Sequence, residues 1–353
     1  MRYHHNLFFR IAVRLTLVLL IIIFSIIAAS PDCIAAPHAK YAGEFLAIGV
    51  GGRALGLGGA YAALANDVTS GYWNPAGLSQ MRYPQITLMH DERFGGLVNY
   101  DYSAVALPVG VSNSLALSII RLGVDDIANT QQAWTDLNNN GIVESNELDN
   151  SKITYFNVAD WALLFSYAKK ATDNFAYGVN LKVIRRENGS ASATGIGFDI
   201  GAQYLVSDQL MLGANFQDVT TTLIAWNTGT NEIISPTLKL GGAYFIDAFG
   251  GRFAPAFDVD VRFERRAYAS NAHLGAFSFD FHSGLEFDFK NLVALRTGYS
   301  DIGSFNIGTG IHLPKFDIDY SFAKFNGADQ LDNTHRISLT FTLQAEQFLR
   351  SSE

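Results

Sequence analysis

One stretch of the sequence has the residue types and the spacing of a calcium-binding loop. Residues 136–147, DLNNNGIVESNE, fit the pattern D-x-[DN]-x-[DN]-G-x5-E at every defined position. Oxygen ligands at this spacing suit Ca²⁺, and Gly141 allows the sharp turn that the loop needs. The expected ligands of one structural Ca²⁺ ion are the side chains of Asp136, Asn138, Asn140, Glu144 and Glu147 and the backbone carbonyl of Ile142.

The same twelve residues also fit a plain surface loop. Asn, Asp and Gly favour turns whether or not a metal is bound. Two of the expected ligands are neutral Asn side chains, which predicts a weak affinity of the kind found in extracellular modules. The sequence therefore predicts a Ca²⁺ site, with an Asn-rich loop without a metal as the alternative.

A second stretch, GVGGRA at residues 49–54, has the spacing of a dinucleotide-binding turn. Such a turn lies between a strand and a helix of a parallel βαβ unit, with further units after it. No such units follow residues 49–78. We therefore interpret this Gly- and Ala-rich stretch as a segment that packs in a confined space, and we expect no organic cofactor.

The first 35 residues have the features of a secretory signal peptide. Arg2 and Arg10 belong to a basic leader, residues 15–29 are almost wholly apolar, and Cys33 and Ala35 provide the small residues of a cleavage site. A retained anchor is the alternative, but the apolar run is shorter than the ~20 residues that span a bilayer. Cleavage would remove the only cysteine and so exclude a disulfide scaffold.

The composition narrows the class of protein further. The chain has 25 basic and 33 acidic residues, and it is therefore a poor candidate for nucleic-acid binding. Phe and Tyr are abundant, with 26 and 15 residues, whereas Pro is sparse, with 8. This composition is not that of a typical α/β enzyme.

From residue 85 onward, large apolar and polar residues alternate. In residues 257–263, FDVDVRF, every odd position is apolar and every even position is charged, and residues 277–289 and 316–322 repeat the pattern. A period of two indicates a strand with one apolar and one polar face. Segments of about ten such residues, separated by turns, predict a transmembrane antiparallel β-barrel that is apolar toward lipid and polar toward the lumen.

The alternation divides the chain into fourteen expected strands, an even number as bacterial barrels require. The longer loops, over 124–155, 219–235, 264–276 and 325–334, are expected on the outer side. The expected strands are 85–92, 97–108, 113–123, 156–168, 174–186, 193–206, 208–219, 236–247, 253–263, 277–289, 291–300, 303–313, 315–325 and 334–344. On this basis the chain comprises a signal peptide (1–35), a segment before the barrel (36–84), the barrel (85–345) and a C-terminal tail (346–353).

The segment before the barrel resembles a known family. Residues 52–61, GRALGLGGAY, and above all residues 72–78, YWNPAGL, are similar to the N-terminal signature of FadL-type outer-membrane proteins, with the closer likeness to the PorV/PorQ branch. The resemblance is specific over residues 41–80 and rests beyond them on strand pattern and length. It implies a FadL-like barrel of fourteen strands in the cell outer membrane, with an N-terminal plug in the lumen.

The motif Asn74-Pro75-Ala76-Gly77 is expected to lie in this plug. A residue before Pro favours an extended conformation, and Asn bonds readily to its own backbone. Gly77 would then relieve the tight return into the first strand. The motif is as well explained by a structural turn as by contact with cargo, so we assign these four residues to the plug and not to a catalytic site.

The resemblance implies two non-enzymatic functions. As in the PorV branch, the barrel would receive exported proteins that carry a sorting domain; alternatively, as in FadL-type members, it would pass hydrophobic small molecules such as fatty acids or hydrocarbons. The expected partners are outer-membrane lipid and either a hydrophobic small molecule or a secreted protein. An enzyme is disfavoured because no G-x-S-x-G motif is present, and His282 is expected to point into the lumen among Lys182, Lys239, Arg262 and Arg296.

Overall fold

The structure is a computed structural model that describes residues 43–266, 270–325 and 333–350. The chain divides into two compact units, Met1–His38 and Ala39–Glu353. The first unit, with the signal peptide expected over residues 1–35, lies outside the described residues. In the part of the chain that the structure describes, no helix has the length and apolarity needed to cross a bilayer.

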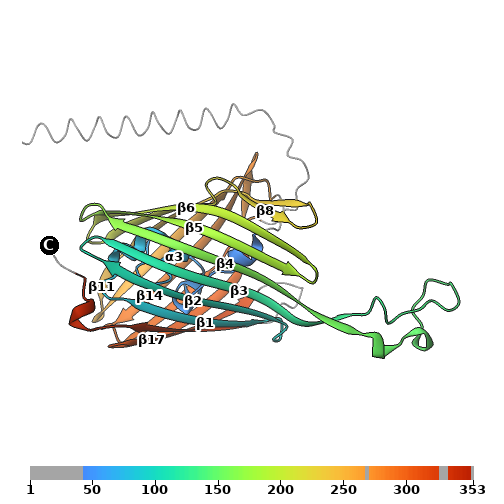
Figure 1. Cartoon of the computed structure of the whole chain (residues 1–353). Helices are drawn as coiled ribbons and strands as arrows, with labels where there is room; N and C mark the ends of the chain where they lie inside the picture. Colours follow the sequence, from blue (N-terminus) through green and yellow to red (C-terminus); the bar gives the residue numbers. More distant parts are fainter. Residues whose placement is uncertain (1–42, 267–269, 326–332, 351–353) are drawn as a thin grey trace, which may run out of the picture. The chain divides into compact units, whose positions relative to one another are not determined.

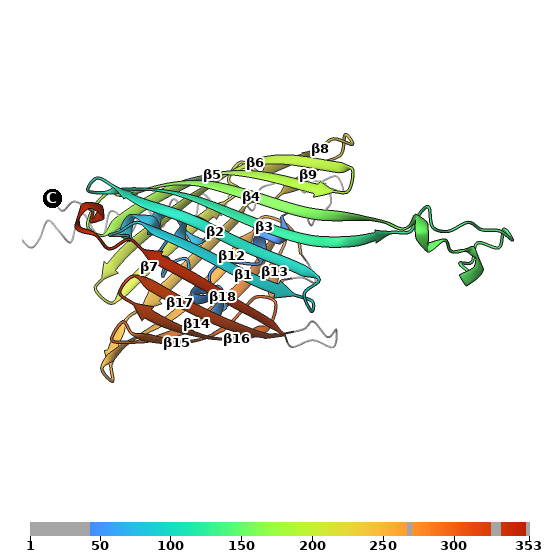
Figure 2. The ribbon, with the colours of Figure 1, turned by 60° about the horizontal axis from the view of Figure 1, so that its bottom comes forward.

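Fourteen strands form a closed antiparallel barrel, which confirms the predicted fold class. Each strand pairs with the next, and the last strand pairs with the first through Gln85↔Thr342 to Glu92↔His335 (Figures 1 and 2). The strands are β1 (Gln85–Arg93), β2 (Val98–Val109), β3 (Asn113–Asn129), β4 (Thr154–Lys170), β5 (Phe175–Asn188), β6 (Ala191–Ser207), β7 (Leu210–Gln217), β10 (Thr237–Tyr244), β12 (Gly251–Arg262), β14 (Phe277–Phe289), β15 (Val293–Tyr299), β16 (Ser304–Leu313), β17 (Phe316–Phe325) and β18 (Thr334–Thr342).

The alternation of side chains runs in the predicted direction. Phe257 is exposed on the outer surface of β12, whereas its neighbours Asp258 and Asp260 are buried inside. The same phase places Leu88 outside and Thr87 inside on β1. Closure gives each of the fourteen strands a partner on both sides, and the outer face is apolar, so the chain is a multi-pass β-barrel of the outer-membrane type.

Four further strands lie in regions that the sequence left as loops or strand ends. The predicted loop over 219–235 contains the hairpin of β8 (Thr222–Trp226) and β9 (Asn231–Ile234), and the predicted loop over 264–276 contains β13 (Ala272–Leu274). After a break at Phe245, β11 (Ile246–Ala248) continues β10 along β12. These strands were missed because each has only three to five residues, too few for an alternating pattern to stand out.

The long connections, between β3 and β4, β7 and β10, and β12 and β14, lie at one end of the barrel, which we call the outer end. The short turns, such as those after β2 and β6, lie at the opposite, periplasmic end. At the periplasmic end, the tail carries η5 (Glu346–Phe348). Arg350 binds the carbonyl of Met81 there, with Nε and O 2.8 Å apart.

The described residues before β1, 43–84, fill the lumen. They contain only short helices: η1 (Glu44–Ala47), α2 (Gly52–Gly56), α3 (Ser70–Trp73) and η2 (Pro75–Gln80). Nearly every residue from 49 to 79 is buried. The helix α2 contacts β15 to β18, whereas η2 contacts β2 to β6, so this segment touches opposite sides of the wall. We call residues 43–84 the plug.

Candidate functional site

The motif Asn74-Pro75-Ala76-Gly77 joins α3 to η2 inside the plug. Asn74 is extended, as expected before Pro, and its Oδ1 accepts a hydrogen bond from the Ala76 N–H at 3.2 Å, which caps η2. Its Nδ2 donates to Ala62 O at 2.8 Å in the plug and to Ala202 O at 3.1 Å in β6. Asn74 thus ties two parts of the plug to the barrel wall.

Inward-facing glycines let the plug lie directly on the backbone of the wall. A Cβ on Gly178 of β5 would lie 2.5 Å from the carbonyl carbon of Pro75. A Cβ on Gly284 of β14 would lie 2.7 Å from the carbonyl oxygen of Leu57. A larger residue at either position would collide with plug backbone, which has no rotamer by which to yield. The plug is therefore wedged between strands on opposite sides of the lumen.

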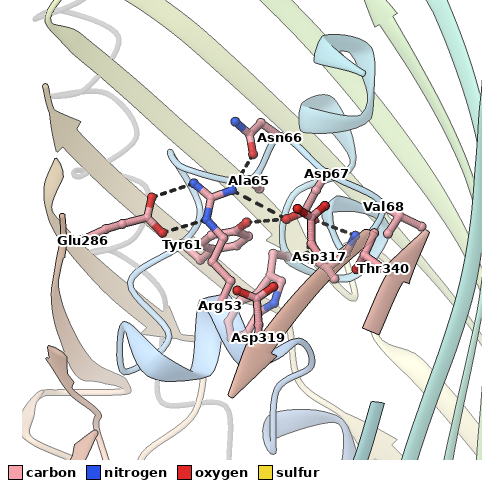
Figure 3. Close-up of polar contacts among 12 residues, drawn as sticks. Arg53, Tyr61, Ala65, Asn66, Asp67, Val68, Glu286, Asp317, Asp319 and Thr340 are labelled. Carbon is pink, nitrogen blue, oxygen red and sulfur yellow. Dashed lines mark hydrogen bonds and ion pairs between the residues drawn. The ribbon is translucent and has the colours of Figure 1, made fainter. Parts of the chain in front are cut away.

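Arg53 connects the plug to the wall through charge. Its Nε and Nη2 donate to the two carboxylate oxygens of Glu286 in β14, at 2.9 and 2.8 Å (Figure 3). Its Nη1 donates to Asn66 at 2.8 Å, and the guanidinium lies over the ring of Tyr61. Bidentate pairing of this kind fixes position as well as charge. Glu286 also accepts from Arg296 at 2.7 Å.

In the Gly-rich turn that contains Arg53, the amides of Gly51 and Gly52 are already bound. The Gly51 N–H donates to the sulfur of Met89, and the Gly52 N–H donates to the hydroxyl of Ser338 at 2.9 Å. Gly49 and Gly51 have φ of 87° and 81°, which explains why glycine is needed at both positions. The turn is a packing element of the plug.

Above the plug, toward the outer end, the lumen holds a cavity of about 330 Å³, which we call the outer cavity. Plug residues Tyr72 and Trp73 form part of its lining, and burial raises the pKa of the Tyr72 phenol above its ordinary value. The Trp73 indole is fixed by its N–H, which donates to Val50 O at 2.8 Å. Other apolar side chains of the lining are those of Leu46, Ile48, Leu55, Ile233 and Ile234.

Much of the remaining lining is polar, and its lysines and arginines are bound to carboxylates. Lys182 binds Asp199 and Asp218 at 3.2 and 2.8 Å, and Lys239 binds Asp260. Arg262 binds Asp280, and Arg296, elsewhere in the lumen, binds Glu286 and Asp319. His282 faces inward, as its phase predicted.

The outer cavity adjoins a break in the barrel wall. The pairing of β7 with β10 ends at Gln217↔Thr237, and the hairpin of β8 and β9 begins at Thr222↔Ile234. Four residues therefore lie between these two paired regions on the side of β7 and β8, and two on the side of β9 and β10. Within the four, Asp218 and Thr221 have φ of 53° and 58°. Among the described strands, β9 pairs only with β8. We call residues 218–221 and 235–236 the wall break.

A buried network links the wall break to the plug. The Asn180 amide donates to Gly71 O in the plug at 2.8 Å and to Asp199 at 3.1 Å. Asp199 in turn accepts from the backbone N–H of Asp218 at 2.9 Å. Sequence reasoning missed this network because its members come from four separate parts of the chain; their inward phase was the only available signal.

The calcium-like loop lies far from this network. Beyond Gly123 and Val158, β3 and β4 pair only with each other and project past the neighbouring strands as a two-stranded arm (Figures 1 and 2). The bridge Trp134↔Leu148 closes the base of the loop at the tip of this arm. The structure therefore places the plug motif and the calcium-like loop in separate regions.

Within the loop, the first and last acidic residues bind backbone amides. Asp136 Oδ2 accepts from the Gly141 N–H at 2.9 Å, and Glu147 Oε1 accepts from the Leu137 N–H at 2.9 Å. Asn138 and Asn140 turn their side-chain oxygens onto N–H groups of the same turn. Among the described residues, no three or more His, Cys, Asp or Glu side chains are grouped as a metal site. Ca²⁺ binding stays a prediction.

No protein-family model matches the sequence, and no curated protein matches it significantly. Solved structures do match in fold. The Pseudomonas putida toluene transporter TodX matches with a TM-score of 0.58 and 12% identity over 83% of this chain and 98% of its own. The CymD monoaromatic hydrocarbon channel matches with a TM-score of 0.57 and 14% identity, over 84% and 98%.

The Ralstonia pickettii toluene transporter TbuX gives a TM-score of 0.56 and 13% identity, over 83% of this chain and 98% of its own. Identities this low establish the fold only. A Pseudomonas aeruginosa FadL homologue, with a TM-score of 0.50 and 13% identity over 87% of this chain and 98% of its own, has the same architecture. The chain is therefore similar in fold to FadL-type barrels.

Proposed function

We propose that the protein is a FadL-type transporter that admits a hydrophobic or amphipathic small molecule at the outer membrane. The observation that carries this proposal is the outer cavity, which adjoins the wall break above a wedged plug. The fold shared with hydrocarbon channels supports it.

The wedged plug favours a route through the wall. A ligand that passed straight through the lumen would have to displace residues that lie on the backbone of β5 and β14. The wall break offers a shorter path, because Gln217, Asp218 and Ser235 line the cavity beside it. Leu223 is exposed on the outer face of the adjoining hairpin. A hydrophobic molecule would leave the cavity there for the membrane.

The test measures uptake of toluene into proteoliposomes that contain the barrel. We expect uptake faster than into empty liposomes, and we expect Ser235→Trp to slow it at least tenfold by filling the wall break. Ser283→Trp, on the lipid-facing side of β14, is the matched control and leaves the rate unchanged. Wild-type uptake no faster than into empty liposomes would contradict the function, whereas rapid uptake by Ser235→Trp would contradict the route.

A second candidate function is recognition of a secreted protein, as in the PorV branch, and the arm favours it. The outer edges of the arm, over 124–129 and 154–157, have no strand partner among the described residues. Tyr155, Leu137 and Ile142 are 66%, 66% and 63% exposed. An unpaired edge with exposed apolar side chains is a surface to which another chain adds a strand.

Affinity capture of the tagged barrel from native outer membranes distinguishes the two functions. A variant in which an Asn-Gly turn replaces residues 125–156 keeps the barrel and removes the arm. Secreted proteins that co-elute with the full protein but not with this variant would support recognition by the arm. Capture of the same proteins by both forms would contradict it.

We also propose that one Ca²⁺ ion orders the tip of the arm, with the ligands Asp136, Asn138, Asn140, Ile142, Glu144 and Glu147. The support is the motif together with the closed loop, in which the Glu147 carboxylate accepts from the Leu137 N–H, next to Asp136 in the chain. The ion would have a structural role.

A further inference from the structure

Asp260 and His282 form a polar pair in the outer cavity, and each has one polar atom without a hydrogen-bond partner among the described residues. Asp260 of β12 and His282 of β14 both line the cavity. Lys239 binds Oδ2 of Asp260, and His282 Nε2 lies 3.5 Å from the same oxygen. His282 Nδ1 lies 2.8 Å from the plug carbonyl of Gly58 and must be its donor, because a carbonyl only accepts.

Two atoms of this pair make no hydrogen bond to any described residue. They are Oδ1 of Asp260 and Nε2 of His282, and their side chains are 2% and 9% exposed. Buried polar atoms are normally satisfied, by protein, by water or by a ligand. The carboxylate oxygen requires a donor, whereas the imidazole nitrogen accepts when it is neutral and donates when it is charged.

The charges around the pair discriminate against an anionic ligand. All lysines and arginines of the lining are bound to carboxylates: Lys182, Lys239, Arg262, and also Arg93, Arg266 and Arg336. A ligand carboxylate would have to displace one of these partners, and it would add an acceptor beside Asp260, which already has an unsatisfied acceptor. When His282 is charged, a hydroxyl donates its proton to Oδ1 of Asp260 and accepts from the Nε2–H of His282, so it satisfies both free atoms without displacing an ion pair.

An apolar wall lies next to the polar pair. Gly59 lies between the Trp73 ring and His282. A Cβ on Gly59 would be 3.1 Å from His282 Nδ1 and 3.5 Å from the Trp73 ring, so the two side chains flank this glycine. Leu55 and Ile48 continue the apolar side of the cavity. We propose that Asp260 and His282 form a subsite for the hydroxyl end of a neutral amphipathic ligand whose apolar body lies against Trp73. This inference rests on the proposed transport function and names the class of its substrate.

The test compares three probes of the same ring size: benzyl alcohol, toluene and benzoate. Binding is followed by the emission of Trp73 in a variant that keeps only this tryptophan, embedded in lipid nanodiscs. We expect the Kd of benzyl alcohol to be at least tenfold lower than the Kd of toluene or of benzoate. We expect Asp260→Asn to reduce this preference to less than threefold, with the Kd of toluene unchanged.

Asp247→Asn, an exposed acidic residue of β11, is the control of equal charge change and keeps the full preference. Should Asp260→Asn fail to fold, His282→Gln is measured in its place and is expected to reduce the preference for benzyl alcohol. It keeps a donor for the Gly58 carbonyl but alters the subsite. Equal affinity for benzyl alcohol and toluene in the protein with Asp260 and His282 intact would overturn the subsite. So would an unchanged preference for benzyl alcohol in both Asp260→Asn and His282→Gln. Either result leaves the transport proposal intact, because that proposal is judged by toluene uptake and by Ser235→Trp. A Trp73 signal that responds to no probe also overturns the subsite.

Discussion

The wedging of the plug predicts that one added methyl group on β5 is costly. In Gly178→Ala, the new Cβ would lie 2.5 Å from the Pro75 carbonyl carbon and 2.7 Å from the Ala76 nitrogen. Ordinary contact begins at 3.4 Å, so η2 must retreat by about 0.9 Å, the difference between 3.4 and 2.5 Å. The Asn74 bond to Ala202 O, already 3.1 Å long, would then break.

The size of the effect follows from these two changes. Overpacking a tight interior costs about 1–3 kcal/mol, and loss of a buried hydrogen bond costs about 1–3 kcal/mol. We expect Gly178→Ala to lower the free energy of unfolding by about 3 kcal/mol. The control Gly242→Ala adds the same methyl group to β10, where a Cβ meets only the side chain of Leu212 at 3.6 Å. We expect less than about 0.5 kcal/mol there.

Urea titration of the purified barrel, read by the gel mobility of folded and unfolded protein, measures both values. A second readout locates the change: Ser79→Cys, at a plug residue 3% exposed, is expected to react with maleimide in the Gly178→Ala background but not in the Gly242→Ala background. Equal stability of the two alanine variants, with Ser79→Cys protected in both, would refute the wedged plug.

Two further predictions concern the arm and the plug. Titration with CaCl₂ is expected to change the fluorescence of Trp134, whose Nε1 lies 3.2 Å from Glu147 Oε2, with a Kd of about 10⁻⁴ to 10⁻³ M. Glu147→Gln removes this change, and an unaltered titration in that variant would argue against the site. In a double-mutant cycle, Arg53→Met and Glu286→Gln are expected to couple by at least about 1 kcal/mol in urea unfolding, because both side chains are largely buried. The exposed pair Arg252–Asp247 is expected to show no measurable coupling, and additivity at Arg53 and Glu286 would mean that their bond does not hold the plug.

The barrel was predictable from the sequence because each spanning strand must present one face to lipid and the other to the lumen. That constraint acts locally, on residues i and i+2, so a run such as 277–289 identifies a strand by itself. The wall break was not predictable. Residues 227–230 have the composition of a turn, and the flanking strands β8 and β9 have only five and four residues.

The plug was identified through a family resemblance, but its partners could not be. Arg53 and Glu286 are separated by 233 positions, and no local pattern relates residues at that distance. One signal was available. Glycines such as Gly178 and Gly201 occupy inward positions where the alternation calls for a polar side chain, and glycine in a strand often marks the close approach of another backbone.

The closed ring of strands also constrains the order of assembly. The plug precedes every strand in sequence, yet Leu57 lies against Gly298 in β15 and Gly52 binds Ser338 in β18. Once β1 and β18 have paired, the wall leaves no seam through which this segment could enter sideways. After closure the segment could enter only through an open end of the barrel, which favours filling of the lumen before or while the final pair of strands forms. Contacts between such distant parts of a chain form slowly, so biogenesis of this barrel would be limited by the joint docking of its first and last elements.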